Sequence, residues 1–491
     1  MTDRALPLPL DHSYARDVPS LSLRWRARPV DPSGVRLLAV NDPLAQQLGL
    51  DPQWLRSPAG LAFLTGRSSE EVPAYAQAYA GHQFGGYSPQ LGDGRALLLG
   101  EVTDRRGCRQ DLHLKGSGAT PFARRGDGRA VVGPMLREYL VGEAMHALGV
   151  PTTRALAVVA TGDPVVREGS QPGAVLCRVA SSHLRVGTFQ YAAALGDPGV
   201  LRALADHASA RHHRSAAEAE NPYLALYSAV VRAQAELVAA WMGVGFVHGV
   251  LNTDNVAISG EGLDYGPCAF MDVCDPATVF SSIDQGGRYA YGSQPGVTQW
   301  NLARLGEALL PLIDESAEAA VESATEVLKS FTDSYRDAFT GVMAAKLGVP
   351  AGALAGSASA GTGLVEETIS VLTTHRVDFT SFFRGLCTGT ARELFDDPGA
   401  YDRWAARRDA LRSGPVDDEQ VQASMSRANP VYIPRNHRVE EVLAAAAEDD
   451  LAPFERLLAA VTRPFEERPE LVDLAGPGPV GGPPHVTFCG T

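Results

Sequence analysis

The sequence lacks long apolar runs, a signal-peptide pattern and an excess of basic charge. No stretch of about 18 uninterrupted apolar residues occurs, so we expect no membrane-spanning helix. The first residues, Met1 to Arg4, do not begin the charged-then-apolar pattern of a secreted protein, and we expect a cytoplasmic protein with no membrane partner. The net charge of −14 argues against a nucleic-acid partner, because nucleic-acid-binding domains usually carry a basic surface.

The cysteines lack the spacings that bind metals or form a redox motif. None of the six belongs to a CxxC pair, and we expect Cys108, Cys177 and Cys387 to be buried, reduced thiols. The composition, 45% hydrophobic and 20% charged, is ordinary for a globular protein with a large core. The length of 491 residues predicts roughly two to four domain-sized units.

The most informative absence is a single aspartate. The segment from His248 to Asn255 has the spacing of a protein-kinase catalytic loop, H-R-D-x-x-x-x-N, in which the Asn falls seven residues after the His. Asp264-Tyr265-Gly266 follows it, as the D-F-G motif does in kinases. Val250, however, occupies the position of the catalytic Asp. We infer a site that binds a metal-nucleotide but lacks the usual base for a substrate hydroxyl.

The acidic and amide residues of this segment are candidates for metal binding and proton transfer. Asn255 and Asp264 would hold one or two Mg²⁺ or Mn²⁺ ions, since these hard cations prefer carboxylate, amide and phosphate oxygens. Asp254 is the remaining acidic candidate, which either accepts a proton from an incoming hydroxyl or orients a ligand. His248 is expected to anchor the loop rather than to take part in chemistry.

A strand lysine and a helix glutamate form a second candidate pair. Lys115 ends an alternating strand that begins at Leu112, and Glu138 follows on an amphipathic stretch over 135–145. In kinases a strand lysine contacts nucleotide phosphates and pairs with a glutamate of the next helix. Taken alone, the two residues fit a solvated lysine and a surface glutamate better. Together with Asn255 and Asp264 they favour a catalytic pair.

Glycines and arginines near this lysine suggest phosphate contacts. The loop over 85–95 contains Gly92 and Gly94 and ends at Arg95, and glycine lets backbone N–H groups approach phosphate oxygens. A hairpin turn at Asp93-Gly94 explains the same glycines equally well. The run 124–129 places three arginines around Asp127 and Gly128, which fits either a solvated loop or a loop that reaches over a nucleotide.

Arg178 and Arg185, seven residues apart in an otherwise apolar region, form the strongest candidate for phosphate binding. Arginine stays charged when buried and binds phosphate in a bidentate manner.

The order of predicted elements defines the fold class. Strand-like runs at 36–40, 96–100, 112–115, 155–160 and 174–180 precede helical stretches at 198–213 and 222–243. We predict an α+β, bilobal, protein-kinase-like fold with a β-rich N-terminal lobe and a larger, mostly helical C-terminal lobe. The Gly/Ala/Ser-rich segment 351–363 is predicted to be a surface loop or linker. The expected units are an N-terminal extension packed on the core (1–75), the β-rich lobe (76–195), the helical lobe (196–474) and a Gly/Pro-rich tail with Cys489 (475–491).

Together these motifs resemble those of the selenoprotein O family of pseudokinases, in its bacterial cysteine form. The resemblance covers nearly the whole chain and depends on several specific stretches. These are Tyr79 to Gly85, Leu91 to Ala96, Leu114 to Gly118, Ser182 to Phe189, His248 to Asn255, Asp264 to Pro267, Asn429-Pro430 and Arg435 to His437.

The resemblance implies a protein nucleotidyltransferase. Members of that family transfer AMP from ATP to Ser, Thr or Tyr hydroxyls of proteins, with the nucleotide flipped relative to kinases, and bacterial members are also credited with UMP transfer from UTP. By position, Asn255 and Asp264 would bind metal, Asp254 would accept the proton, and Lys115 would act with Glu138. The nucleotide would be contacted by Gly92, Gly94, Arg95, Lys115, Asp127, Gly128, Arg178, Arg185 and Asp264.

The C-terminus departs from the family pattern at one position. Cys489 is third from the end, where family members carry selenocysteine or cysteine. In some bacterial relatives that residue forms a disulfide with a cysteine of the activation segment, and the corresponding position here is Phe280. The resemblance therefore does not carry redox gating over to this chain.

Two other functions fit the same residues. One is a conventional phosphotransferase that uses Asp254 as its base. The other is a non-catalytic scaffold that binds nucleotide, which the retained metal ligands and strand lysine disfavour.

Overall fold

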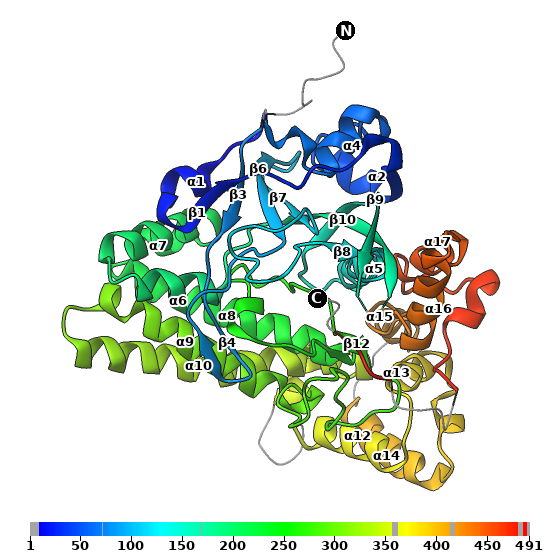
Figure 1. Cartoon of the computed structure of the whole chain (residues 1–491). Coiled ribbons are helices and arrows are strands. Elements are labelled where there is room, and N and C mark those ends of the chain that lie inside the picture. Colours follow the sequence, from blue (N-terminus) through cyan, green and yellow to red (C-terminus); the bar gives the residue numbers. More distant parts are fainter. Residues whose placement is uncertain are drawn as a thin grey trace.

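The computed structural model describes residues 9–70, 72–167, 169–355, 362–412, 418–479 and 485–488. It is a mixed α and β structure with one large antiparallel sheet. Figure 1 shows the strands of this sheet in the upper half of the view, with long helices beneath them and a second group of helices at the lower right. Among the described residues, no helix combines the length and the apolar character that a membrane crossing needs.

The sheet has eight strands, and each described pairing within it is antiparallel. The strands predicted at 36–40, 96–100, 112–115, 155–160 and 174–180 are all confirmed, each within a strand of the sheet. In spatial order the strands are β1 (Ser22–Trp25), β3 (Ala74–Gln77), β6 (Ala96–Thr103), β7 (Arg109–Lys115), β10 (Ser170–Ala180), β9 (Arg154–Val166) and β2 (Arg36–Val40), and β8 (Ala130–Val131) pairs with β10.

The register of the sheet places the strand lysine and an arginine on one face. Lys115 on β7 lies opposite Leu176 on β10, and His113 lies opposite Arg178. Because side chains alternate along a strand and directly paired residues share a face, Lys115, His113 and Arg178 all point to the same side.

Helix α5 (Val132–Ala147) covers this sheet and confirms the helix predicted over 135–145. Its buried residues share a core with the strands and with two later helices, α16 (Asn436–Ala447) and α17 (Ala452–Val461). Nearly the whole helix is buried, and the buried positions include polar residues such as Glu138.

The helical part begins with α7 (Pro198–His212) and α8 (Pro222–Gly243), which confirm the predicted stretches at 198–213 and 222–243. Asp197 and Asn221 cap these two helices, each followed by a proline at the first helical position. Short strands β11 (Phe246–Val247) and β12 (Ala269–Phe270) pair and thereby fix both ends of the intervening segment. The largest helices after it are α9 (Gln294–Ile313) and α10 (Ala317–Leu347).

The remaining elements are shorter. They are α1 (Ser13–Asp17), α2 (Asp42–Gln47), α3 (Pro52–Arg56), α4 (Pro58–Leu64), β4 (Gly81–Gln83), β5 (Gly86–Ser88), α6 (Val186–Ala194), α11 (Ala351–Ala355), α12 (Thr362–Thr374), α13 (Phe379–Thr388), α14 (Pro398–Leu411) and α15 (Asp418–Ala428).

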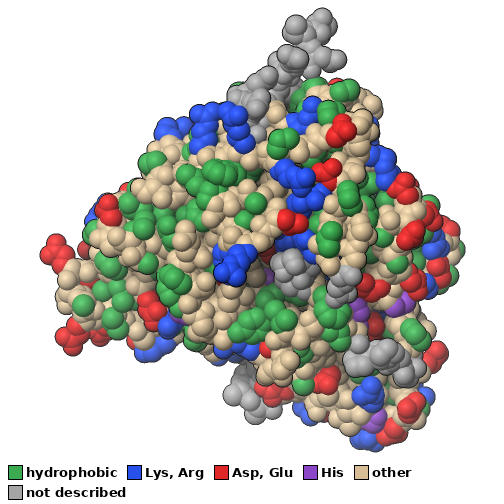
Figure 2. Space-filling model, in the orientation of Figure 1, with side chains coloured by type: hydrophobic (Ala, Val, Ile, Leu, Met, Phe, Trp, Pro, Cys, Tyr) green, Lys and Arg blue, Asp and Glu red, His purple; other side chains and the backbone are tan. Residues whose placement is uncertain are grey.

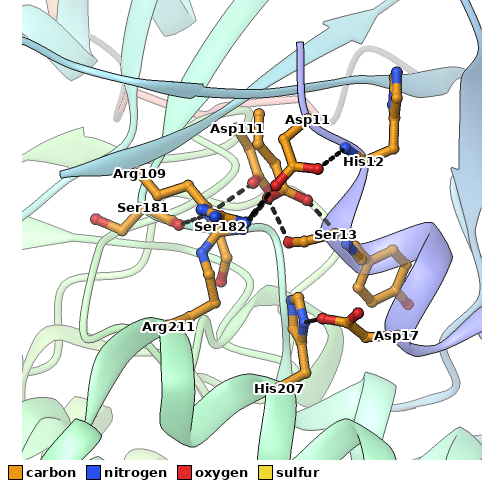
Figure 3. Close-up of polar contacts among 12 residues, drawn as sticks. Asp11, His12, Ser13, Asp17, Arg109, Asp111, Ser181, Ser182, His207 and Arg211 are labelled. Atoms are coloured by element: carbon orange, nitrogen blue, oxygen red, sulfur yellow. Dashed lines mark hydrogen bonds and ion pairs between the residues drawn. The ribbon is translucent and has the colours of Figure 1, made fainter. Parts of the chain in front are cut away.

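The N-terminal segment connects the sheet to the helical part. Figure 3 shows Asp17 turned toward His207 of α7, and these side chains lie 2.9 Å apart. Ser13 binds Glu101 of β6, and Arg211 of α7 bonds to Asp111 of β7. Strands β1 and β2 also belong to the main sheet, so the segments 1–75 and 76–195 share one sheet.

Two local predictions are wrong. Residues 351–355 form helix α11 and α12 begins at Thr362, although 351–363 was predicted to be a loop; residues 356–361 lie outside the described part. Alanine has the highest helix propensity, and here it outweighs the neighbouring glycine. Cys108 is exposed, because it lies in the turn between β6 and β7, where its backbone N–H bonds to Asp104. Cys177 and Cys387 are buried free thiols, as predicted.

Candidate active site

A cleft of about 430 Å³ lies between the sheet and the segment that β11 and β12 enclose. Several basic side chains line the cleft of this acidic chain, among them Lys115, Arg178 and Arg185. Figure 2 shows Lys and Arg side chains on the upper half of the face that it presents. Every residue predicted for nucleotide, metal or catalysis lines the cleft. These are Gly92, Gly94, Arg95, Lys115, Asp127, Gly128, Glu138, Arg178, Arg185, Asp254, Asn255 and Asp264.

A cluster of ion pairs occupies the deep end of the cleft. Lys115 Nζ lies 2.7 Å from Glu138 Oε2 and 2.7 Å from Asp264 Oδ1. Arg178 bridges the same two carboxylates, with Nε 2.6 Å from Glu138 Oε1 and Nη2 2.5 Å from Asp264 Oδ1. Arg185 Nη1 reaches Asp264 Oδ2 at 3.3 Å. Three cations therefore face two carboxylates, which suits an additional anionic ligand.

The charges in this cluster hold one another in their ionised forms. Burial opposes ionisation of Asp264, but the charges of Arg178, Lys115 and Arg185 together hold the pKa of this carboxyl well below its usual range. Burial likewise opposes ionisation of Glu138, and Arg178 and Lys115 lower its pKa. The arginines are nearly inaccessible, at 2% side-chain exposure for Arg178 and 5% for Arg185. Removing one member of such a buried group of charges leaves another charge unpaired and destabilises the folded protein.

The backbone directs Asp264 into the cluster. Its φ of 64° is in the left-handed region, which is uncommon for residues with a side chain and which aspartate adopts more readily than most. The next residue, Tyr265, is fully buried and its hydroxyl bonds to Thr152 Oγ1 at 2.5 Å. This anchor fixes the turn that presents Asp264.

His248 holds the other end of the segment, as predicted. It is completely buried, its Nε2 lies 2.8 Å from the carbonyl oxygen of Leu263, and its backbone N–H donates to Gln294 Oε1. The imidazole therefore ties residues 248 and 263 together, on either side of the predicted catalytic residues.

Asn255 and Asp254 present different groups to the cleft. Asn255 Nδ2 donates to the carbonyl oxygen of Val250 at 2.9 Å, so its amide oxygen is the atom suited to a metal ion. Asp254 Oδ2 accepts from Gln83 Nε2 at 3.0 Å, whereas Oδ1 is buried without a hydrogen-bond partner among the described residues. Burial raises the pKa of Asp254 to about 6. A carboxyl whose pKa is raised toward neutrality is suited to exchange a proton.

The donor set fits a metal held partly by its ligand. Within the described ranges, no group of three or more His, Cys, Asp or Glu side chains could hold a metal by itself. One carboxylate and one amide oxygen, from Asp264 and Asn255, match the few protein ligands that Mg²⁺ takes when phosphates and water complete its shell.

The glycine-rich loop contains a hairpin, but not at Asp93-Gly94. The two-residue turn lies at Phe84-Gly85, between β4 and β5, and both residues have positive φ, as a type I′ turn requires. Asp93 is instead buried, accepting from the backbone N–H of Gln77 and lying 3.1 Å from His113 Nε2. Gly92 has a φ of 77°. A Cβ there would lie 2.4 Å from Phe122 Cγ, so only glycine brings this backbone to the cleft wall.

The arginine-rich loop closes one side of the cleft. Asp127 pairs with Arg167 at 3.0 Å and also accepts from the backbone N–H of Arg129. A Cβ on Gly128 would lie 2.1 Å from the backbone nitrogen of Ala119, so this loop is pressed against the chain after β7. The carboxylate of Asp127 thus organises the loop, while both Asp127 and Gly128 line the cleft.

Among the lining residues that were not assigned a role from the sequence, Tyr79, Gln83 and His113 are placed beside the predicted ones. Tyr79 lies under Arg185, with the guanidinium carbon 4.4 Å from the ring centroid. Gln83 bonds to Asp254, and His113 points to the same face as Lys115. His113 was accessible to sequence reasoning, because it is two residues from Lys115 on a predicted strand. The other two lie in the motif Tyr79 to Gly85, which gave no chemical signal.

The C-terminal segment lies beside Phe280. The backbone N–H of Thr487 donates to the carbonyl oxygen of Phe280 at 2.8 Å, and the Phe280 ring packs edge-on against His485. Cys489 itself lies outside the described residues.

A mixed α and β fold with a deep cleft of buried cations and carboxylates is the framework of a protein that binds a phosphate-bearing ligand. Residues 26–462 match the family model described as protein adenylyltransferase SelO. The chain is 57% identical to the protein nucleotidyltransferase YdiU of Mycolicibacterium paratuberculosis over 493 residues, covering 98% of each chain. It is 55% identical to the protein of the same name from Cereibacter sphaeroides strain KD131 over 488 residues, covering 98% of this chain and 99% of the relative. The protein belongs to the SelO family of protein adenylyltransferases.

Proposed function

We propose that the protein transfers AMP from ATP to Ser, Thr or Tyr hydroxyls of proteins and releases pyrophosphate. The observation that carries this proposal is the position of Asp264, which meets Lys115, Arg178 and Arg185 in the same cleft that holds Asp254. Family membership and the printed names of the relatives support nucleotide transfer to proteins.

We further propose a kinase-like division of labour between two lobes. In this reading the sheet with α5 is the N-terminal lobe, and the helices from α6 onward form most of the C-terminal lobe. The Lys115–Glu138 ion pair between β7 and α5 supports the comparison, because kinases join a strand lysine to a helix glutamate in the same way. The segment from His248 to Asp264 would serve as catalytic loop and metal motif.

The reaction follows from where the charges lie. Lys115, Arg178 and Arg185 would bind the β- and γ-phosphates at the deep end of the cleft, which leaves the α-phosphate facing the acceptor. The acceptor oxygen forms a bond to the α-phosphorus, the bond from that phosphorus to the pyrophosphate oxygen breaks, and the hydroxyl proton passes to the Asp254 carboxylate. The three cations stabilise the charge that develops on pyrophosphate.

Asn255 and Asp264 would hold the divalent ion, Mg²⁺ or Mn²⁺. When bound, such an ion neutralises phosphate charge and polarises the phosphoryl group. The protein's own part is to orient the triphosphate and to keep Asp254 ready for the proton.

Val250 explains why this chemistry differs from phosphoryl transfer. The position that carries the catalytic Asp in kinases has an aliphatic side chain here, and that side chain is buried. Asp254 lies four residues further along and is the acidic group nearest in sequence to the metal ligand Asn255. The relatives' broader name, nucleotidyltransferase, favours testing UTP beside ATP, since both share the triphosphate that these residues would bind.

Labelled ATP tests the proposal against its two alternatives. With α-labelled ATP and Mg²⁺ we expect label to appear on acceptor proteins, and with γ-labelled ATP we expect none. Label from the γ position alone would make the protein a phosphotransferase. Absence of transfer from either position, together with intact nucleotide binding, would make it a scaffold. The variant Asp264→Ala should abolish transfer. The control variant Asp333→Ala, which removes an exposed carboxylate on α10, should not.

A further inference from the structure

The hairpin of β4 and β5 is joined residue by residue to the segment that carries Asp254. The backbone N–H of His82 donates to Thr253 Oγ1 at 2.7 Å. The backbone N–H of Phe84 donates to Asn252 Oδ1 at 3.2 Å. Between them, the Gln83 side chain donates to Asp254 Oδ2 at 3.0 Å. Three consecutive hairpin residues thus contact three consecutive residues of the predicted catalytic loop.

The main-chain contacts at both sides of Gln83 are supported from the helical part. Thr253 Oγ1 donates to Gln190 Oε1 at 2.7 Å, and Nε2 of the same glutamine lies 2.8 Å from His82 Nδ1. Tyr289 packs its ring against that of Phe84, with centroids 5.0 Å apart. These contacts do not involve the Gln83 side chain, so the hairpin should keep its place when that side chain is changed.

The two oxygens of Asp254 are in unequal surroundings. Oδ2 is held by Gln83, and Oδ1 is buried with no hydrogen-bond partner among the described residues. A Cβ on Gly81 would lie 2.5 Å from Oδ1, so the first residue of the hairpin leaves room for that oxygen only because it is glycine. An ionised carboxylate only accepts hydrogen bonds, so the Gln83 amide must present its NH₂ group to it. The amide therefore fixes the rotation of the carboxyl, with Oδ2 at Gln83 and Oδ1 packed against Gly81.

We propose that Gln83 is a positioning residue for Asp254, which holds the carboxyl of Asp254 in one rotation at the cleft. The inference rests on the proposed function, in which Asp254 receives the proton of the acceptor hydroxyl. It assigns the β4–β5 hairpin a role in the transfer step rather than in nucleotide binding, since Gln83 donates to neither of the predicted metal ligands nor to the cation cluster in the described contacts.

The test compares two variants of nearly the same length as glutamine. Gln83→Met removes the donor, and Gln83→Glu replaces it with a second carboxylate that repels the first. A matched control is Gln53→Ala, an exposed glutamine on α3 remote in sequence from the cleft. The initial rate of transfer is measured with α-labelled ATP, Mg²⁺ and an unfractionated bacterial protein extract as the acceptor. ATP affinity and melting temperature are measured on the same preparations.

We expect Gln83→Met to lower the maximal transfer rate about tenfold, and Gln83→Glu to lower it further, because general-base catalysis depends on the orientation of the base. The ATP dissociation constant should stay within about twofold of the wild-type value. The melting temperature should stay within a few degrees of wild type, roughly the change that a conservative substitution causes. The control should match wild type throughout.

A double-mutant cycle separates positioning from a structural role. If Gln83 acts through Asp254, Gln83→Met should have no further effect once Asp254→Asn is present, since groups that act as a unit are non-additive. The inference would be overturned if Gln83→Met lowered the rate equally in both backgrounds, or if it left the rate unchanged. It would also be overturned if the rate fell only in proportion to weaker ATP binding or a lower melting temperature. A wild-type protein that transfers no α-label would instead overturn the proposed function, so the two failures are distinguishable.

Discussion

Asp264 and Arg178 are in direct contact, with Arg178 Nη2 2.5 Å from Asp264 Oδ1, and Lys115 Nζ lies 2.7 Å from that same oxygen. One carboxylate oxygen therefore neutralises two buried cations. A divalent ion that binds Asp264 would compete with both of them. The cations would then be released toward the phosphates that arrive with the ion, so the cluster is set to exchange a carboxylate for a phosphate partner.

Lys115→Ala tests the cation that is shared between Glu138 and Asp264. We expect transfer from α-labelled ATP to fall by about 100-fold or more, because a fixed charge at a developing anion contributes several kcal/mol to transition-state binding. Glu138 and Asp264 each lose one buried partner but keep Arg178, so the melting temperature should fall while the protein stays folded. The matched control is Lys329→Ala, an exposed lysine on α10. Unchanged activity in Lys115→Ala would mean that another cation serves the phosphates.

Arg185→Lys tests which phosphates the second arginine binds. Lysine keeps the charge but lacks the planar fork, so a single nitrogen would replace the guanidinium that can bind a phosphate in a bidentate manner. We expect ATP affinity to fall about tenfold while AMP affinity changes little, since AMP lacks the terminal phosphates. Calorimetric titration of both nucleotides measures this. Arg304→Lys, which also stacks on an aromatic ring but lies outside the cleft lining, should leave both affinities unchanged.

Much of the site was accessible from the sequence because its residues lie in local patterns. The strand alternation before Lys115, the helix that carries Glu138 and the seven-residue spacing of His248 and Asn255 each fix a side chain relative to its neighbours. The sheet register then brought Arg178 beside Lys115, as the clustering of polar residues in an apolar region suggested.

Long-range contacts were beyond that kind of reasoning. The pairing of Gln83 with Asp254 joins residues 171 positions apart, and no local period encodes it. The left-handed backbone of Asp264 was likewise not predicted, because aspartate adopts this conformation more often than most residues but at no fixed place in a motif. At α11 the sequence contains alanine, which favours a helix, and glycine, which disfavours it. Composition alone led to the wrong prediction of a loop.

Gly92→Ala tests the role of the glycine-rich loop. The substitution combines an unfavourable φ with a contact to Phe122, so we expect ATP affinity to fall about tenfold and the free energy of unfolding to fall by about 1–3 kcal/mol. Gly107→Ala is the matched control for backbone strain, since its φ is also positive but a Cβ there meets nothing within 4 Å. It should lose a little stability and keep its ATP affinity. Equal ATP affinity in Gly92→Ala would remove this loop from the nucleotide site.

The buried histidine His183 should make the fold sensitive to mild acid. Its Nδ1 lies 3.2 Å from Asp111 Oδ2, its ring stacks on His113 with centroids 4.1 Å apart, and the charged groups facing it are Arg178 and Arg211 together with Asp111. Burial, reinforced by His113, lowers the pKa of His183 to about 3, although Asp111 opposes this shift.

Between pH 6.5 and 3 the unfolded chain therefore binds a proton at His183 that the folded chain does not bind. The free energy of unfolding then falls as the pH falls, with a slope of up to about 1.4 kcal/mol per pH unit from this one group. The lowered pKa of Asp111 adds a loss of the same sign at lower pH, below the usual range of a carboxyl.

Urea unfolding of wild type and of His183→Gln, followed between pH 7.5 and pH 4.5, measures this slope. The variant should be less stable at pH 7.5, because it loses the contact to Asp111, but its stability should fall less steeply below pH 6.5. His375→Gln, at the end of α12 and remote from this network, should keep the wild-type slope. Equal slopes in His183→Gln and wild type would show that His183 gains its proton in the folded protein as readily as in the unfolded chain.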